Sequence, residues 1–155
     1  MRFILFFLII TIILAPSCNK KKQEPSPHVN TFTANVNGTA FVTTGIEILF
    51  GGSSVPGARQ VNVYANAANG HIVTLIMLDY NSTVKTFTQS IGVYSIAPGI
   101  NNSSYSTGGQ IVISSIGKST YTDGEVVTGT FQFDTDATVG IYHITNGNFS
   151  VFVKH

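Results

Sequence analysis

The chain has 155 residues, with 8 basic and 7 acidic side chains, and only 10% of its residues are charged. An ordinary soluble domain carries about 25% charged residues. A net charge of +1 leaves no basic patch of the kind that nucleic-acid binding requires, so we expect no nucleic-acid partner. The single cysteine excludes an intrachain disulfide and a zinc site built from several cysteines.

Residues 1–17 have the layout of a secretory signal peptide. A short basic start is followed by an apolar run over residues 3–14, broken only by Thr11. This run is too short for a membrane-spanning helix, which needs about 20 residues. It matches the apolar core of a secretory signal, which has about 7–15 residues. We therefore exclude residues 1–17 from the predicted fold.

The apolar run leads into Ala15-Pro16-Ser17-Cys18, which resembles the lipobox of bacterial lipoproteins. In that family the signal is removed just before the cysteine, which then carries fatty acids such as palmitate. The usual box has Leu three places before the cysteine, where this chain has Ala15. The resemblance implies lipidation at Cys18 and attachment to a membrane through the acyl chains. The alternative is an accidental cysteine at the start of a soluble secreted protein.

Residues 18–28 are predicted to be the lipidated cysteine and a flexible tether. Residues 20–22 are all lysine, and Pro25 and Pro27 favour an extended backbone. The lysines can attract anionic headgroups, but we prefer to interpret them as a solvated spacer. By resemblance to lipoprotein sorting, Asn19 in place of Asp permits the outer membrane. The basic tether differs from acidic surface-export signals, which favours the periplasmic side over the cell surface.

Residues 29–155 are predicted to form a single all-β domain, because apolar and polar side chains alternate with a period of two. Asn-Gly pairs at 37–38, 69–70 and 146–147 predict tight turns between strands. Residues 71–80 are apolar on both faces, which predicts a central strand buried on two sides, with a buried helix as the alternative.

The remaining segments complete an antiparallel β-sandwich or partly closed barrel of about 9–11 strands, which we expect to be a monomer. Residues 110–116 are predicted to be a strand, and residues 100–109 are predicted to be mostly loop. Tyr105 is placed on a short edge strand within that loop. The expected core includes Ile76, Ile111, Ile113, Phe131, Phe133 and Phe149.

Several segments resemble a family pattern in the same order. These are VTGTFQF at 127–133, ITNGNFS at 144–150, FTANVNGTAF at 32–41, and IGVY at 91–94, where Val93 replaces the usual Thr. The chain resembles small uncharacterised lipoproteins of Bacteroidota-type bacteria, which carry a domain of unknown function. The resemblance covers most of residues 30–153. It implies an envelope location and an all-β fold, and it brings no catalytic residues.

We find no motif that predicts catalysis, a metal or a cofactor. Residues 117–120 read GKST, but a phosphate-binding loop needs Gly where Val112 stands. Asp134 and Asp136 imitate the start of a calcium loop that Thr138 and Val139 do not continue. The four histidines, at positions 28, 71, 143 and 155, have no metal-ligand spacing. We therefore expect a protein that is not an enzyme.

Three tyrosines are candidate ligand contacts. Tyr64 is predicted to face outward on its strand, and Tyr105 and Tyr121 lie in or near predicted loops. Exposed tyrosines can stack on sugars or peptides, although tyrosine is also common at strand edges without any ligand.

Two functions fit these expectations. The first is a non-enzymatic binding or envelope-associated module at the outer membrane, whose partner is an envelope protein or a glycan. The alternative is a lipocalin-like carrier, in which a small barrel holds an apolar ligand inside. The shape of the interior distinguishes the two, since a carrier needs an open apolar cavity of about 300 Å³ or more.

Overall fold

The computed structural model describes residues 28–89, 91–119 and 123–155, which form ten strands and one 3-10 turn. The strands are β1 (Thr31–Val36), β2 (Thr39–Phe41), β3 (Thr43–Gly51), β4 (Arg59–Ala67), β5 (Ile72–Tyr80), β6 (Thr86–Phe87), β7 (Gly92–Ser95), β8 (Ser103–Lys118), β9 (Gly124–Thr135) and β10 (His143–Lys154). The turn η1 (Ile100–Asn102) precedes β8. The predicted all-β fold is confirmed. No helix in these ranges is long and apolar enough to cross a membrane.

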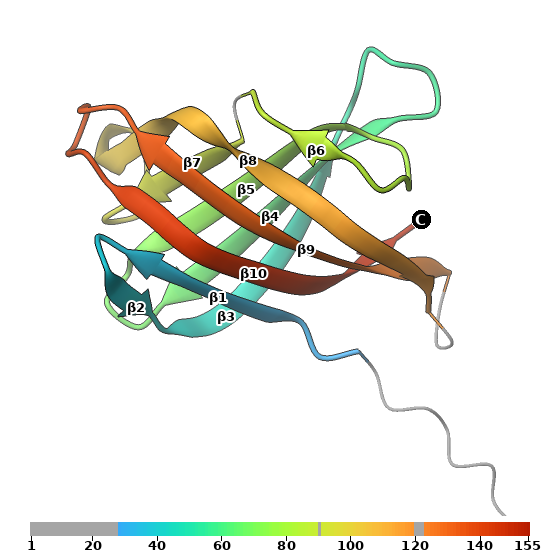
Figure 1. Cartoon of the computed structure of the whole chain (residues 1–155), viewed down its shortest axis with the longest axis horizontal. Helices are drawn as coiled ribbons and strands as arrows, with labels where there is room; N and C mark the ends of the chain where they lie inside the picture. The colour runs from blue at the N-terminus through green and yellow to red at the C-terminus, as the bar shows by residue number, and fades with distance from the viewer. Residues whose placement is uncertain (1–27, 90, 120–122) are drawn as a thin grey trace, which may run out of the picture.

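The strands form one antiparallel sheet that curls almost closed into a barrel (Figure 1). Neighbouring strands follow the order β2-β1-β10-β9-β8-β7-β5-β4-β3, and β6 pairs with β8 outside this path. β2 and β3 lie at opposite ends of this order, yet only Val42 separates them in the sequence. The chain therefore passes from one end of the sheet to the other at Val42 and brings both ends together. Of the two expected architectures, the partly closed barrel is the one observed.

Inward-facing side chains fill the middle of the barrel. The ring of Phe131 on β9 lies 4.9 Å from the ring of Phe32 on β1. It also packs against Phe133 and Phe149, at 6.5 and 6.4 Å between ring centres. The prediction of buried side chains is confirmed for Ile111, Ile113, Phe131, Phe133 and Phe149. These side chains belong to one core cluster of buried residues inside the barrel.

The strand β5 is fully buried along its inner face only, although Thr74 on the outer face is also buried. Val73, Leu75 and Met77 point inward and are fully buried, whereas Ile76 is half-buried and Leu78 is 39% exposed. In the described ranges no helix covers the outer face of the barrel. The predictions of a strand buried on both faces, and of Ile76 in the core, are therefore wrong.

The Asn-Gly pairs have two different roles. Asn37 and Gly38 both have positive φ angles, 49° and 80°, and form the predicted turn between β1 and β2. Asn146 and Gly147 instead lie inside β10, at a β-bulge where the register with β9 shifts. A Cβ atom at Gly147 would lie 2.5 Å from the backbone oxygen of Phe131, so glycine permits this close approach. The predicted turn at 146–147 is wrong.

The strand β8 is longer than predicted. It begins at Ser103, so most of the segment expected to be loop is extended. Tyr105 lies within this long strand, opposite Val93 of β7, and not on a short edge strand as predicted. Residues 103–105 pair with β7, whereas residues 106–118 pair with β9. A single strand thus joins the two halves of the barrel, and its mixed Ser, Thr and Gly composition hid its length from the sequence pattern.

Candidate functional site at one end of the barrel

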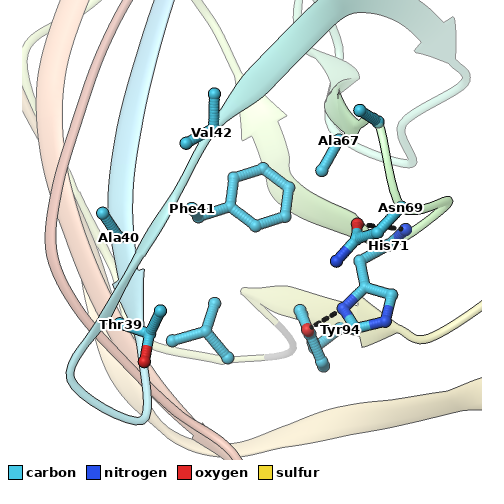
Figure 2. Close-up of a pocket in the computed structure, with 10 residues that line it drawn as sticks. Thr39, Ala40, Phe41, Val42, Ala67, Asn69, His71 and Tyr94 are labelled. Carbon is cyan, nitrogen blue, oxygen red and sulfur yellow. Dashed lines mark hydrogen bonds between the residues drawn. The ribbon is translucent and has the colours of Figure 1, made fainter.

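One end of the barrel contains a pocket of about 400 Å³, which we call the end pocket (Figure 2). It lies between the β1–β2 hairpin and the turn that joins β4 to β5, with Tyr94 of β7 beside them. Among the described residues, no hydrogen bond joins the hairpin to that turn, so the end of the barrel stays open there. The volume falls within the range of small-molecule sites, about 300–1,000 Å³.

The walls of the end pocket are mostly apolar. The ring of Phe41 projects into it, and Ala67 faces it from the β4 side (Figure 2). Val36 and Ala40 line the hairpin side, and Val42 stands at the rim with 72% of its surface exposed. A ligand that covered these side chains would be favoured by about 25 cal/mol for each Å² of apolar surface removed from water.

The polar part of the pocket centres on His71 and Tyr94. The His71 Nδ1 atom and the Tyr94 hydroxyl are 2.5 Å apart, and the backbone N–H of His71 donates to the Asn69 side chain at 3.1 Å (Figure 2). Burial of Tyr94, followed by the nearby Tyr142, raises the pKa of its hydroxyl. Tyr94 therefore keeps its proton, and when it donates to Nδ1 of a neutral His71, the imidazole carries its own proton on Nε2.

This arrangement can bind a molecule but lacks a reactive pair. The residues that line the end pocket include no carboxylate, thiol or lysine. Nucleophilic catalysis needs a side chain activated by a base within hydrogen-bond reach, and His71 is engaged with a phenol. The pocket offers an apolar cavity with a small hydrogen-bonding group at one side, which is the usual composition of a binding site.

The tyrosines chosen from the sequence lie elsewhere. Tyr64 faces outward on β4, as the alternation predicts. Tyr105, which the sequence predicts in or near a loop, is 46% exposed on β8. The register links Tyr64 to Thr74, Thr74 to Val93, and Val93 to Tyr105, so the two tyrosines occupy one row across the outer face. Three strand spacings separate their backbones, about 14 Å. Tyr121 and the lipidation candidate Cys18 lie outside the described residues.

A polar cluster occupies the other end of the strands. Glu125 is 6% exposed, and its carboxylate accepts hydrogen bonds from Tyr80 and Ser82. His155 Nε2 lies 3.8 Å from the other carboxylate oxygen. Nearby, the Arg59 guanidinium donates to the backbone oxygen of Lys154 at 2.6 Å. These contacts hold the ends of β4, β5, β9 and β10 together.

The remaining histidines have local partners. His143 lies 2.7 Å from the exposed Asp134 carboxylate, and His28 is 3.2 Å from the backbone oxygen of Ser150. Asp136 accepts hydrogen bonds from the backbone of Tyr105 and Thr138, which lowers the pKa of its carboxyl group. Within the described ranges, no three His, Cys, Asp or Glu side chains come close enough together to hold a metal ion.

Sequence reasoning missed the end pocket. Its lining residues are ordinary strand and turn residues, and the local signals beside it are the Asn37-Gly38 and Asn69-Gly70 turns. The pocket forms because two turns far apart in the sequence meet at one end of the barrel, which no periodicity reveals. Comparisons with protein-family models, curated protein sequences and solved structures give no match.

Proposed function

We propose that the protein is a non-enzymatic binding protein of the bacterial envelope that holds the apolar part of a small molecule in the end pocket. The observation that carries this proposal is the pocket itself: about 400 Å³ with apolar walls and one hydrogen-bonding pair, His71 and Tyr94. The aromatic rings that pack around Phe131 inside the barrel favour a ligand at the end of the barrel over one at its centre.

The ligand class follows from the pocket's chemistry. Apolar walls favour an aliphatic or aromatic body, and the imidazole and the Asn69 amide favour one neutral polar group on that body. The residues that line the pocket include no Asp, Glu, Lys or Arg that could pair with a strongly charged ligand. We therefore propose a small, mostly uncharged, amphipathic molecule.

We also propose that Cys18 carries acyl chains and that these hold the protein on the outer membrane, with the barrel on the periplasmic side. The support is the signal-like segment over residues 1–17 and the resemblance of residues 15–18 to a lipobox. A tether of residues 18–28 would then connect the membrane to the start of β1.

The experiment uses 2-naphthol as a probe, since it combines an apolar bicyclic body with one hydroxyl group. Binding to the full-length chain in detergent is compared among the parent, Ala67→Trp and Ala137→Trp. Ala67 lines the end pocket, whereas Ala137 is exposed in the loop after β9, so the second variant controls for an added indole. All samples share one detergent, so probe that enters micelles affects them equally.

We expect Ala67→Trp to weaken binding at least tenfold and Ala137→Trp to leave it unchanged. His71→Phe should weaken 2-naphthol binding about three- to tenfold, the effect of one lost hydrogen bond, and should leave binding of 2-methylnaphthalene nearly unchanged. Equal affinity of the parent and Ala67→Trp would place the probe elsewhere and refute the pocket as the binding site.

A further inference from the structure

The strand β3 has one backbone edge that pairs with no other strand in the described part of the chain. Its nine residues pair with β4 along one side only, and β1 pairs with β2 only from Ala34 onward. In the strand order, β3 lies at one end of the sheet, and β1 lies next to β2 at the other end. A groove of about 420 Å³ lies between residues 30–33 and 43–46, and we call it the seam.

Among the described residues, few contacts connect the two sides of the seam. The Thr43 hydroxyl donates a hydrogen bond across it to the backbone oxygen of Phe32, at 3.1 Å. That contact lies at the narrow end, next to Val42, where the chain passes from β2 to β3. Beyond it, the backbone groups along the outer edge of β3 face away from β4, the only strand paired with it among the described residues.

The inward side of β3 is incompletely covered. Its inward residues Ile46 and Ile48 are half-buried, and Phe50 is 46% exposed. Their partners on β4, Ala65, Val63 and Val61, face the same interior and have 0% exposure. The core is therefore fully covered one strand away from the seam and only partly covered beside it. One more strand next to β3 would cover these side chains.

Beyond the β-bulge between Thr43 and Gly45, the edge has little of the usual protection against strand addition. Exposed edge strands are commonly blunted by lysine, proline or short length. β3 runs for nine residues without lysine or proline, and Glu47 is its only charged residue. The outward neighbour Leu49 is 45% exposed. An edge of this kind is a template for an added strand.

We propose that an extended segment of a partner polypeptide adds as a strand along the outer edge of β3. The segment would place apolar side chains beside Ile46, Ile48 and Phe50, and a lysine or arginine opposite Glu47. Opposite charges on directly paired residues stabilise a sheet, and like charges destabilise it. A second copy is disfavoured for the same reason, because the self-pairing that uses all nine residues sets Glu47 against Glu47. The seam and the end pocket share no lining residue, so this proposal is independent of the ligand.

The probe is the capped nine-residue peptide Thr-Val-Thr-Val-Lys-Val-Thr-Val-Thr, which reads the same in both directions and therefore tests either strand orientation. A second peptide carries Glu in place of its central Lys. Each is added to the full-length chain in mild detergent, and amide hydrogen exchange is followed by mass spectrometry. Sedimentation of the same samples reports whether the chain is monomeric.

We expect the Lys peptide to slow exchange over residues 43–51 and to bind about fivefold more tightly than the Glu peptide. In the Glu47→Lys variant, the Glu peptide should bind more tightly than the Lys peptide. Asp134→Lys removes an exposed acidic side chain on β9, far from β3 in the strand order, and should preserve the parent's order.

Three results would overturn the proposal. The first is unchanged exchange over residues 43–51 at millimolar Lys peptide. The second is a peptide preference that does not reverse in Glu47→Lys, since binding would then not involve the edge beside that residue. The third is a dimeric parent chain whose residues 43–51 are protected without peptide, because the partner strand would then come from a second copy.

Discussion

The hydroxyl of Tyr80, at the end of β5, donates a hydrogen bond to the buried carboxylate of Glu125, at the start of β9. The Ser82 hydroxyl donates to the same carboxylate oxygen at 2.8 Å. β5 and β9 are not neighbours in the sheet, so these bonds connect the two halves of the barrel across its interior. They connect strand ends at the end of the barrel opposite to the end pocket.

Burial and the Glu125 carboxylate raise the pKa of Tyr80 above its usual value of 10.0. In the unfolded chain this phenol loses its proton near pH 10, whereas in the folded chain it keeps the proton to higher pH. Folded protein then binds more protons than unfolded protein, so the free energy of unfolding should fall as pH rises above 10. Urea titrations between pH 8 and pH 11 measure this slope.

Tyr80→Phe should reduce the alkaline slope and should cost about 1.5–3 kcal/mol at pH 7, the range for a hydrogen bond to a charged group. Some slope should remain, because the pKa of Tyr94 is also raised by burial. Tyr64→Phe changes a tyrosine on the outer face and should keep the parent's slope. A Tyr80→Phe slope equal to the parent's would show that Tyr80 does not hold its proton in this way.

A substitution at Gly129 tests how closely the strands pack beneath the Phe149 ring. A Cβ atom at this position would lie 2.3 Å from the Val112 backbone oxygen and 2.7 Å from that ring. Gly129→Ala should therefore lower the free energy of unfolding by about 1–3 kcal/mol. Gly45→Ala is the matched control, since a Cβ there meets no atom within 4 Å. Chemical denaturation measures the free energy of unfolding of both variants. Equal values for Gly129→Ala and Gly45→Ala would contradict the close packing around Gly129.

Phe131 is the centre of the aromatic core, in contact with Phe32, Phe133 and Phe149. Phe131→Ala should cost about 3–5 kcal/mol, because it removes buried apolar surface and leaves a cavity. Val84→Ala alters a side chain that is 61% exposed and should stay within about 0.5 kcal/mol of the parent. A Phe131→Ala protein as stable as Val84→Ala would refute the assigned core.

Lipidation is tested in growing cells with a labelled fatty acid such as palmitate. The parent chain should incorporate the label and Cys18→Ala should not, because the single cysteine is the only thiol available. Protease added to intact cells should leave the barrel undigested if it faces the periplasm. Equal labelling of Cys18→Ala would contradict the lipobox resemblance, and digestion without lysis would contradict the periplasmic placement.

The alternation of side chains predicted the strands, and five of six core residues, because burial on one face imposes a period of two. It also misplaced Ile76, since an apolar outward residue on an uncovered barrel looks the same in sequence as one beneath a second layer. The sequence predicts a turn at Asn146-Gly147, because an Asn-Gly pair is typical of hairpin turns. The positive φ of Asn146 serves a β-bulge instead, and the sequence pattern does not distinguish the two.

Closure of the barrel and the end pocket could not be read from the sequence. Closure depends on Val42, where one continuous extended segment changes its pairing partner from β1 to β4. Nothing in the residues around Val42 marks this change. The pocket lies between the β1–β2 hairpin and the turn that joins β4 to β5, and no local pattern reveals that these two turns lie at the same end of the barrel.

The measurement that tests the proposed function most directly is native mass spectrometry of the full-length protein isolated from its own membranes, followed by organic extraction. We expect the parent and Ala137→Trp to carry the same small, mostly uncharged amphipathic molecule, and we expect Ala67→Trp, with the end pocket filled, to lack it. A parent protein that carries no such molecule, or an Ala67→Trp protein that retains it to the same extent as the parent, would contradict the proposed function.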